Sequence, residues 1–315
     1  MVESVDGLAE SARKLRAAFE AEVEPLRPAL WRYCHRLTGS AWDAEDLVQE
    51  TMQRALARLA DLWQPVNTKA YLFRVASNAW VDRRRREVRG ELVELAEDQA
   101  AVAVDPELRL EAHDAIARLV AVLTPLQRVV FLLCQTLDFT AREVAALLGT
   151  SEGAVKAALH RARAALAAAP AATPAPRASI RDLARLEPIV RRYVTAFDAR
   201  DPDAIAALLH EDAVTTIVGS AEELGREASR RSSLAEWAAD PVRQWARPGV
   251  VDGREVILVL AEREGAQVLY SIIELRCTTA IHAQRDYFYC PELLEHVAEA
   301  LRLGAWTHGH QYPFA

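Results

Sequence analysis

Long apolar runs are missing from this chain of 315 residues. No stretch reaches the roughly 18 uninterrupted apolar residues that a membrane-spanning helix needs. The first residues, MVESVDGLAESARKLRAAFE, contain neither a basic leader nor the apolar core of an export signal. We therefore expect a soluble, unexported, cytoplasmic protein that does not enter a membrane.

Cysteine is scarce and scattered along the chain. The four cysteines, Cys34, Cys134, Cys277 and Cys290, form no CxxC pair and no Cys/His cluster at zinc-ligand spacing. A disulfide framework and a metal knuckle are therefore excluded, and four ordinary buried thiols are expected. We expect neither a metal nor a cofactor.

Glycine and proline are also too few to define the protein's class. The 12 Gly and 14 Pro show no period, which excludes a collagen-like chain, and 51% hydrophobic with 26% charged residues excludes a wholly disordered one. The length predicts two or three globular domains.

Charge is distributed unevenly, although the net value of −7 gives no sign of a nucleic-acid partner. Residues 1–90 carry 15 basic and 13 acidic groups, residues 91–115 carry 1 and 8, residues 116–170 carry 6 and 3, and residues 171–315 carry 16 and 21. Two mildly cationic blocks therefore flank an acidic connector, and a mildly acidic half follows.

Hydrophobic periodicity divides the chain into two halves. Leu26, Leu30, Tyr33 and Leu37 repeat at three- and four-residue spacing, which predicts an all-α half over the first 170 residues. Residues 167–179, AAAPAATPAPRAS, contain three prolines and no large apolar side chain, so they predict a linker. A helix over 180–200 and strands at 213–218, 254–263 and within 266–290 predict an α+β half.

Residues 43–51, DAEDLVQET, form the first motif. Helical spacing places Asp43, Asp46 and Glu50 on one side and Leu47 and Thr51 on a neighbouring stripe. Taken alone, this pattern is typical of a solvated acidic face.

Residues 71–82, YLFRVASNAWVD, form the second motif and run directly into Arg83–Arg86. Aromatic residues interleaved with polar ones and followed by an arginine run suit stacking on unpaired bases beside a phosphate strand. The alternative is that the aromatics are core residues and the arginines form a solvated helix end.

Residues 140–163 carry the third motif. Thr140 and Glu143 have the spacing of a capping box, Gly149 ends that helix in a tight turn, and Ser151 caps the next helix. A helix-turn-helix is predicted, with the second helix in the major groove and its arginines at phosphates, and a plain helical hairpin is the alternative. That second helix carries Lys156, His160, Arg161 and Arg163.

In this order and spacing, the three motifs resemble an extracytoplasmic-function (ECF) sigma factor of bacterial RNA polymerase over roughly residues 20–168. The resemblance implies that the first motif docks on the clamp of the largest polymerase subunit, that the second melts the promoter and reads the −10 element, and that the third reads the −35 element. The residues expected to bind polymerase are Asp43, Glu45, Asp46, Leu47, Gln49 and Glu50. Those expected to bind promoter DNA are Asn78, Arg83, Arg84, Arg85, Arg86, Ser151, Lys156, His160, Arg161 and Arg163.

The chain departs from this family at one place. Where the family commonly has a Ser-Arg pair after the recognition-helix lysine, this chain has Ala157-Ala158. The loss implies a weaker or altered −35 contact, by about 1–3 kcal/mol if the arginine touched a base. By the same resemblance, the acidic connector threads toward the cationic active-site cleft of polymerase; a flexible solvated linker is the alternative.

The C-terminal half resembles a second family, the polyketide-cyclase-like (SnoaL-type) α+β cone that wraps a curved sheet around a pocket. The helix pair, LLHEDAV at 208–214 and Gly225-Arg226-Glu227 carry the resemblance, whereas the tail 306–312 does not obviously belong to it. Strand alternation places His282 and Asp286 on one face, in a shared pocket or as a surface pair. A regulatory domain that contacts protein is favoured, with a small-molecule sensor and an acid/base enzyme as alternatives.

Five segments are therefore predicted: sigma region 2 at 15–90, an acidic linker at 91–115, sigma region 4 at 116–168, a Pro/Ala linker at 169–179 and a SnoaL-like regulatory domain at 180–315. The predicted function is transcription initiation with core RNA polymerase on promoter DNA, modulated by the C-terminal domain and without catalytic residues. The alternatives are a SnoaL-type enzyme or ligand sensor tethered to a DNA-binding module, and a DNA-binding regulator that never touches polymerase. The sequence leaves open the promoter, the signal, the oligomeric state and whether an anti-sigma factor exists.

Overall fold

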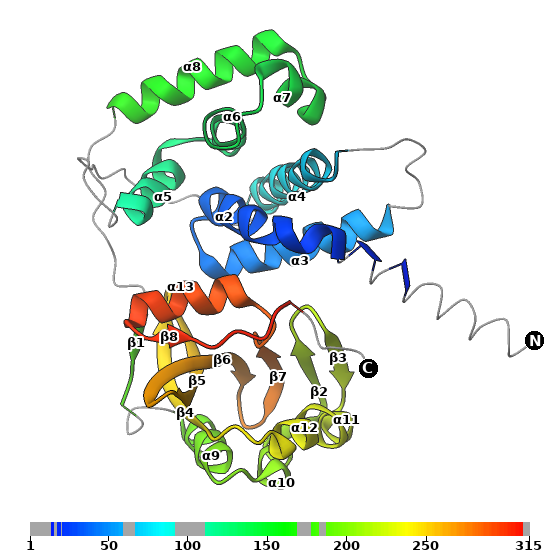
Figure 1. Cartoon of the computed structure of the whole chain (residues 1–315), viewed down its shortest axis with the longest axis vertical. Coiled ribbons are helices and arrows are strands. Elements are labelled where there is room, and N and C mark those ends of the chain that lie inside the picture. Colours follow the sequence, from blue (N-terminus) through cyan, green and yellow to red (C-terminus); the bar gives the residue numbers. More distant parts are fainter. Residues whose placement is uncertain are drawn as a thin grey trace, which may run out of the picture. The chain divides into compact units, whose positions relative to one another are not determined.

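The computed structural model of the chain describes residues 14–15, 18–19, 21–58, 67–91, 111–168, 178–182 and 187–310. It divides into two compact units, Met1–Ala175 and Pro176–Ala315. The first is helical and the second combines helices with one sheet, which confirms the predicted fold class (Figure 1). Most of the predicted acidic linker and Pro/Ala linker lies outside the described residues.

The N-terminal unit is built from helices joined by short turns wherever it is described. Its elements are η1 (Glu24–Leu26), α2 (Arg27–Thr38), α3 (Ala41–Ala57), α4 (Thr68–Glu91), α5 (Glu111–Val122), α6 (Pro125–Thr136), α7 (Ala141–Leu148) and α8 (Glu152–Ala168). Leu30, Leu47 and Phe73 are fully buried where α2, α3 and α4 meet. This three-helix core holds the first two sequence motifs in place.

The turn between α2 and α3 requires glycine. Gly39 ends α2 with φ +79°, and a Cβ built there would lie 2.6 Å from Cγ2 of Val120 on α5. Any other side chain would therefore be strained and would push α5 away from α2. Ser40 begins α3 by accepting a hydrogen bond from the amide of Asp43 at 3.4 Å.

The predicted caps of the helix-turn-helix are confirmed. The Thr140 hydroxyl accepts from the amide of Glu143, and the Glu143 carboxylate accepts from the amide of Thr140. Gly149 closes α7 in the left-handed conformation with φ +62°, and the Ser151 hydroxyl accepts from the amide of Ala154 at 3.2 Å to begin α8. These local contacts satisfy backbone groups that helix ends leave unpaired.

The C-terminal unit consists of one curved sheet with helices on both sides. Its strands are β1 (Ala178–Ile180), β2 (Leu209–Ile217), β3 (Ala221–Leu224), β4 (Gln244–Val251), β5 (Arg254–Arg263), β6 (Ala266–Cys277), β7 (Ile281–Asp286) and β8 (Gly304–Ala305). They pair in the order β1-β4-β5-β6-β7-β2-β3, and β8 pairs with β6. Only β2–β7 and β6–β8 are parallel among these pairs.

Four helices cover one side of the sheet and a fifth covers the other (Figure 1). The four are α9 (Pro188–Asp198), α10 (Pro202–Ala206), α11 (Arg226–Arg231) and α12 (Ser233–Ala239), and the fifth is α13 (Pro291–Leu301). Tyr193 and Phe197 of α9 and Ile205 of α10 join a buried cluster with Ile257 and Ile273 of the sheet.

Three expectations for this unit need correction. The helix expected over 180–200 begins only at Pro188, because Ala178–Ile180 pairs with β4 as strand β1. The strand expected at 213–218 begins earlier, at Leu209. Strand β4 was not among the predicted strands; its Pro248 has no N–H for a ladder, but the strand pairs with β5 along its whole length, with Pro248 opposite Ile257.

Candidate functional site

The acidic face of α3 is exposed only in part. Asp43, Asp46, Gln49 and Glu50 are half-buried. The Asp43 carboxylate lies 3.5 Å from the Arg83 guanidinium, and Glu50 forms an ion pair with Arg54 at 2.5 Å. The face therefore presents carboxylates that the protein's own arginines already orient and partly neutralise.

Two residues of the predicted polymerase-binding set lie in the core instead. Glu45 and Leu47 are both 0% exposed. The Glu45 carboxylate lies 3.6 Å from the Arg27 guanidinium and accepts a hydrogen bond from the Gln49 amide at 2.7 Å. Because α2 covers this side of α3, neither residue can touch a partner, and the prediction is wrong for these two positions.

Helix α4 separates its aromatic and polar residues onto opposite faces. Tyr71, Phe73 and Trp80 are buried, which favours core aromatics over stacking on bases. The Tyr71 hydroxyl donates to the carbonyl of Ala55, which ties α4 to the end of α3. The exposed face carries Arg74, Asn78, Arg84 and Arg86, with Arg83 half-buried and the side chain of Arg85 outside the described residues.

A hollow opens between the end of α3 and the exposed face of α4. Its lining includes Arg54 and Arg58 from α3 and Arg74 and Asn78 from α4. Three guanidinium groups beside an amide supply charge for phosphate and hydrogen bonds for base edges. Sequence analysis missed Arg54 and Arg58; their i, i+4 spacing, one helical turn beyond the acidic motif, was the available signal.

Helix α8 carries the exposed polar groups of the helix-turn-helix. The predicted residues Ser151, Lys156, His160, Arg161 and Arg163 are all exposed. Lys156, His160 and Arg163 follow helical spacing on one stripe, and Val155, Ala158 and Ala162 form the buried stripe opposite. Lys156 pairs with Glu152 at 2.6 Å, and Arg163 donates to the Gln135 side chain of α6 at 2.8 Å.

The two alanines that depart from the family pattern differ from each other. Ala157 is exposed, whereas Ala158 is only 3% exposed and packs against the rest of the unit. A side chain at 158 cannot reach DNA from this helix. In the order of the family's Ser-Arg pair, the missing arginine corresponds to the buried Ala158 and the missing serine to the exposed Ala157.

Arg128 of α6 is a buried cation that connects three helices of the N-terminal unit. It is 5% exposed and donates to the carbonyls of Leu37 at the end of α2, Val120 at 2.7 Å and Leu123 at 3.2 Å. Its guanidinium lies 5.9 Å from the Trp80 ring. Burial, and secondarily the charge of Arg84, lower the pKa of Arg128 to about 10, so it stays protonated at neutral pH.

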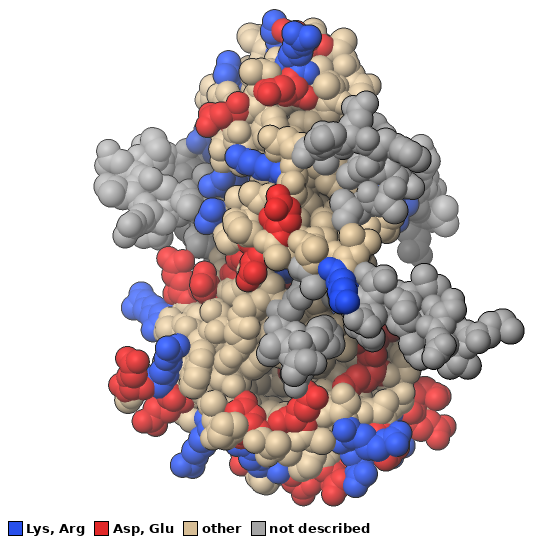
Figure 2. All heavy atoms as spheres, turned by 45° about the vertical axis from the view of Figure 1, so that its right-hand side comes forward, with Lys and Arg blue, Asp and Glu red and all other residues tan. Residues whose placement is uncertain are grey.

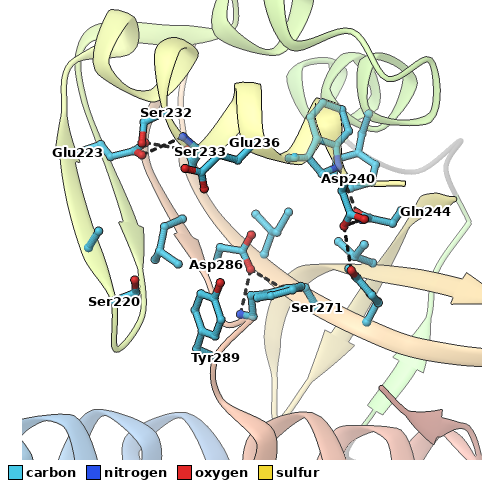
Figure 3. Close-up of a pocket in the computed structure, with 18 residues that line it drawn as sticks. Ser220, Glu223, Ser232, Ser233, Glu236, Asp240, Gln244, Ser271, Asp286 and Tyr289 are labelled. Atoms are coloured by element: carbon cyan, nitrogen blue, oxygen red, sulfur yellow. Dashed lines mark hydrogen bonds between the residues drawn. The ribbon is translucent and has the colours of Figure 1, made fainter. Parts of the chain in front are cut away.

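A cavity of about 410 Å³ lies in the C-terminal unit between the sheet and α12 (Figure 3). Its walls include Glu223, Glu236, Asp240 and Asp286 together with five aromatic side chains, Phe197, Trp237, Tyr270, Phe288 and Tyr289. This volume falls within the range of small-molecule sites.

The structure separates the two residues that the sequence placed in a pocket. Asp286, the last residue of β7, lines the cavity and accepts hydrogen bonds from the Ser271 hydroxyl and from the amide of Phe288 at 3.1 Å. Burial raises the pKa of Asp286 to about 6, against the opposing effect of these hydrogen bonds. His282 is exposed, bonds Thr278 at 3.0 Å and lies against the His210 ring, away from the cavity lining.

The described part of the C-terminal tail packs against the aromatic wall of this cavity. The His308 ring stacks on Phe288 with centroids 4.1 Å apart, and Trp306 meets Tyr270 edge-on at 5.3 Å. His310 bonds the Glu292 carboxylate of α13 at 2.9 Å. The described part of the tail that sequence analysis could not assign thus packs on two aromatic residues that line the cavity, Phe288 and Tyr270.

Within the described ranges, no group of three His, Cys, Asp or Glu side chains is placed to hold a metal ion. Nor does any helix in the same ranges combine the length and the apolar character needed to cross a bilayer.

Three family models match the chain. Residues 23–90 match Sigma-70 region 2, residues 113–166 match Sigma-70, region 4, and residues 190–274 match the SnoaL-like domain. Both resemblances inferred from the sequence are thereby confirmed.

Two curated relatives come from Mycobacterium tuberculosis. ECF RNA polymerase sigma factor SigG is 35% identical over 234 residues, which cover 65% of this chain and 62% of SigG, so the match spans less than two thirds of that relative. ECF RNA polymerase sigma factor SigJ is 30% identical over 263 residues, which cover 77% of this chain and 78% of SigJ. The crystal structure of SigJ aligns with 84% of this chain and 95% of its own, at 22% identity and a TM-score of 0.32.

Proposed function

The chain belongs to the ECF RNA polymerase sigma factors, and from this premise we propose that it binds core RNA polymerase, directs it to promoter DNA and starts transcription there. The observation that carries the proposal is the placement of exposed cationic and amide groups on two separate helices, α4 and α8. The chain catalyses no reaction itself, and it works in the cytoplasm, where polymerase and promoters are found.

The first half of the N-terminal unit supplies the polymerase contact and the −10 contact. The half-buried carboxylates of α3, Asp43, Asp46 and Glu50, meet cationic groups of the polymerase clamp. The hollow formed by Arg54, Arg58, Arg74 and Asn78 holds the promoter strand after it opens. The three arginines and the amide of this lining suit a single strand whose bases have left the duplex.

The helix-turn-helix supplies the −35 contact. Its second helix, α8, presents Lys156 and His160 to base edges, while Arg161 and Arg163 reach phosphates. The dipole of α8 adds to the attraction, because its N-terminus at Ser151 is exposed and favours negative charge.

Polymerase binding is expected to weaken about tenfold with each of Asp46→Arg and Glu50→Arg, because each reverses a charge on the contact face. The measurement is a titration of labelled protein with core RNA polymerase. Glu262→Arg is the matched control, since Glu262 is an exposed carboxylate on β5 of the other unit. Equal affinity of both α3 variants and the parent for core enzyme would show that α3 is not the contact.

We also propose that the C-terminal unit modulates initiation. Residues 169–177, between the end of α8 and the start of β1, number nine, and a chain of that length reaches at most roughly 30 Å when extended. Any association of the two units is therefore an intramolecular event, and such a tether favours association even when the affinity is weak.

Truncation after residue 170 is expected to change the rate of run-off transcription at least about threefold, because it removes the unit that the tether keeps close to the sigma regions. The measurement compares truncated and full-length protein with core polymerase on one template. The control is equal core-polymerase affinity of the two proteins, which isolates initiation from assembly. Identical transcription rates at saturating polymerase would exclude an autoregulatory role.

A further inference from the structure

The cavity of the C-terminal unit carries charge of one sign only. Four carboxylates line it, and none of the lining residues is Lys, Arg or His. The outer face of the same unit is different, because Figure 2 shows acidic and basic side chains interspersed over it. The acidic character is thus a property of the cavity and not of the unit as a whole.

Two of the four carboxylates are already satisfied by the protein. Both oxygens of Glu223 accept hydrogen bonds from Ser233, one from its amide at 3.0 Å and one from its hydroxyl at 2.7 Å. Asp240 accepts from the amide of Val242, from the Gln244 side chain and from the Tyr270 hydroxyl at 2.8 Å. These groups hold the walls in position and keep their negative charge.

The other two carboxylates have oxygen atoms available to a ligand. Oδ1 of Asp286 accepts both of that residue's hydrogen bonds, and Oδ2 has no hydrogen-bond partner among the described residues. Glu236 on α12 lines the cavity without a side-chain partner in the described ranges. In Figure 3 Glu236 projects from the helix above and Asp286 from the strand below, into the same space.

The hydrogen bonds of the Arg200 guanidinium go to neither of these two carboxylates. Arg200 donates to the backbone carbonyls of Trp237, Ala238 and Val242 and lies at the Asp240 end of the cavity. The guanidinium therefore points at backbone carbonyl oxygens, including that of Asp240. Neither Glu236 nor Asp286 has an ion-pair partner among the described residues. Asp286 is half-buried, where charge interactions are stronger than in bulk water, and Glu236 adds a second, more exposed carboxylate to the same cavity.

Aromatic side chains complete the walls. The Phe197 and Trp237 rings lie 4.5 Å apart on the helical side, and Tyr270 meets Phe288 edge-on at 5.3 Å on the sheet side. Aromatic faces bury apolar ligand surface and also attract cations. The combination therefore selects against anions and favours a cation on an apolar body.

We propose that this cavity binds a small organic monocation, an amine carried on an aromatic or aliphatic body, with its ammonium group between Glu236 and Asp286 and its body against Trp237 and Phe288. Ligand binding by this unit goes beyond polymerase and promoter binding. Its test uses no polymerase and no DNA, so its failure leaves the proposed function untouched.

Isothermal titration of the full chain with matched ligands tests the charge requirement. Each series keeps one body, indole, phenyl or cyclohexyl, and changes only the end group from amine to alcohol to carboxylate; on indole these are tryptamine, tryptophol and indole-3-propionate. We expect an amine of at least one series to bind about tenfold or more tightly than its alcohol, and the carboxylates not to bind.

Asp286→Asn and Glu236→Gln test the two residues separately. Each is expected to weaken amine binding about tenfold and to leave binding of the matched alcohol unchanged, because only the charge is removed. Glu222→Gln is the control, since Glu222 neighbours Glu223 on β3 but is exposed and lies outside the cavity lining. Glu236 is itself exposed on α12, so its variant tests the proposal even if Asp286→Asn destabilises the sheet.

The proposal is overturned if no amine of the three series binds at millimolar concentration. It is equally overturned if a carboxylate binds as tightly as its amine, or if Glu236→Gln and a folded Asp286→Asn both bind the amine like the parent. An amine preference that both substitutions abolish, and that Glu222→Gln retains, supports it.

Discussion

Replacing Lys156 and His160 together with alanine is expected to lower the affinity of the polymerase complex for its promoter about 100-fold. Both side chains are exposed on α8, on the stripe opposite the buried Val155 and Ala158, so we expect the substitution to remove contacts with DNA and to leave the packing unchanged. A base-edge contact contributes about 1–3 kcal/mol, and two of them together give an effect of this size. The measurement is fluorescence anisotropy with a promoter found by sequencing run-off transcripts.

The matched comparison is Arg84→Gln with Arg86→Gln on α4. These exposed arginines lie on α4 C-terminal to Asn78, which lines the hollow, and are expected to contact phosphates. Their loss should weaken binding to promoter and random DNA alike, and should flatten the dependence of log affinity on log salt by about one to two. If the α8 variant also loses affinity equally for both kinds of DNA, α8 does not read bases.

Arg128→Met is expected to lower the protection of the α2–α6 contact against hydrogen exchange by about 100-fold or more. The substitution removes a buried cation that donates to three carbonyls, at Leu37, Val120 and Leu123, and leaves those carbonyls unsatisfied. Hydrogen bonds from charged groups contribute about 1.5–3 kcal/mol each. The free energy needed to open this contact should therefore fall by at least about 3 kcal/mol. Hydrogen exchange with mass spectrometry measures amide protection peptide by peptide, so it reports on this contact separately from the C-terminal unit.

Arg142→Met provides the control for this change. Arg142 lies on the neighbouring helix α7 and is exposed, so its loss should not alter protection. The Arg128 variant should also expose the peptides around Gly39 and Val120, which meet at the same contact. Protection equal to that of the parent in both peptides would show that Arg128 does not hold α6 on α2.

The helix-turn-helix was predictable because its signals are local. Thr140, Glu143, Gly149 and Ser151 each act on a backbone group within a few residues of themselves, so spacing alone determines the contact. The exposure of Lys156 and its neighbours followed from the same periodicity. The family resemblances succeeded for a related reason, since they rest on several such motifs in a fixed order.

The second motif left two interpretations open because periodicity does not say which of two faces is covered. Tyr71, Phe73 and Trp80 share α4 with Arg74 and Asn78, and only the packing of α2 and α3 decided that the aromatics are core. Glu45 illustrates the same limit, because a carboxylate in an acidic run gives no sign of burial against Arg27.

By itself, the sequence determined the two-part architecture, the all-α and α+β classes, the helix caps and the exposed residues of α8, because short-range hydrogen bonding and hydrophobic periodicity specify them. Tertiary structure alone decided which groups from distant segments come together. It brought Arg54 beside Asn78, Arg128 to the end of α2, and Glu236 opposite Asp286 across a cavity that excludes His282. These contacts depend on how the sheet curves and how helices cross, which no spacing within one element encodes.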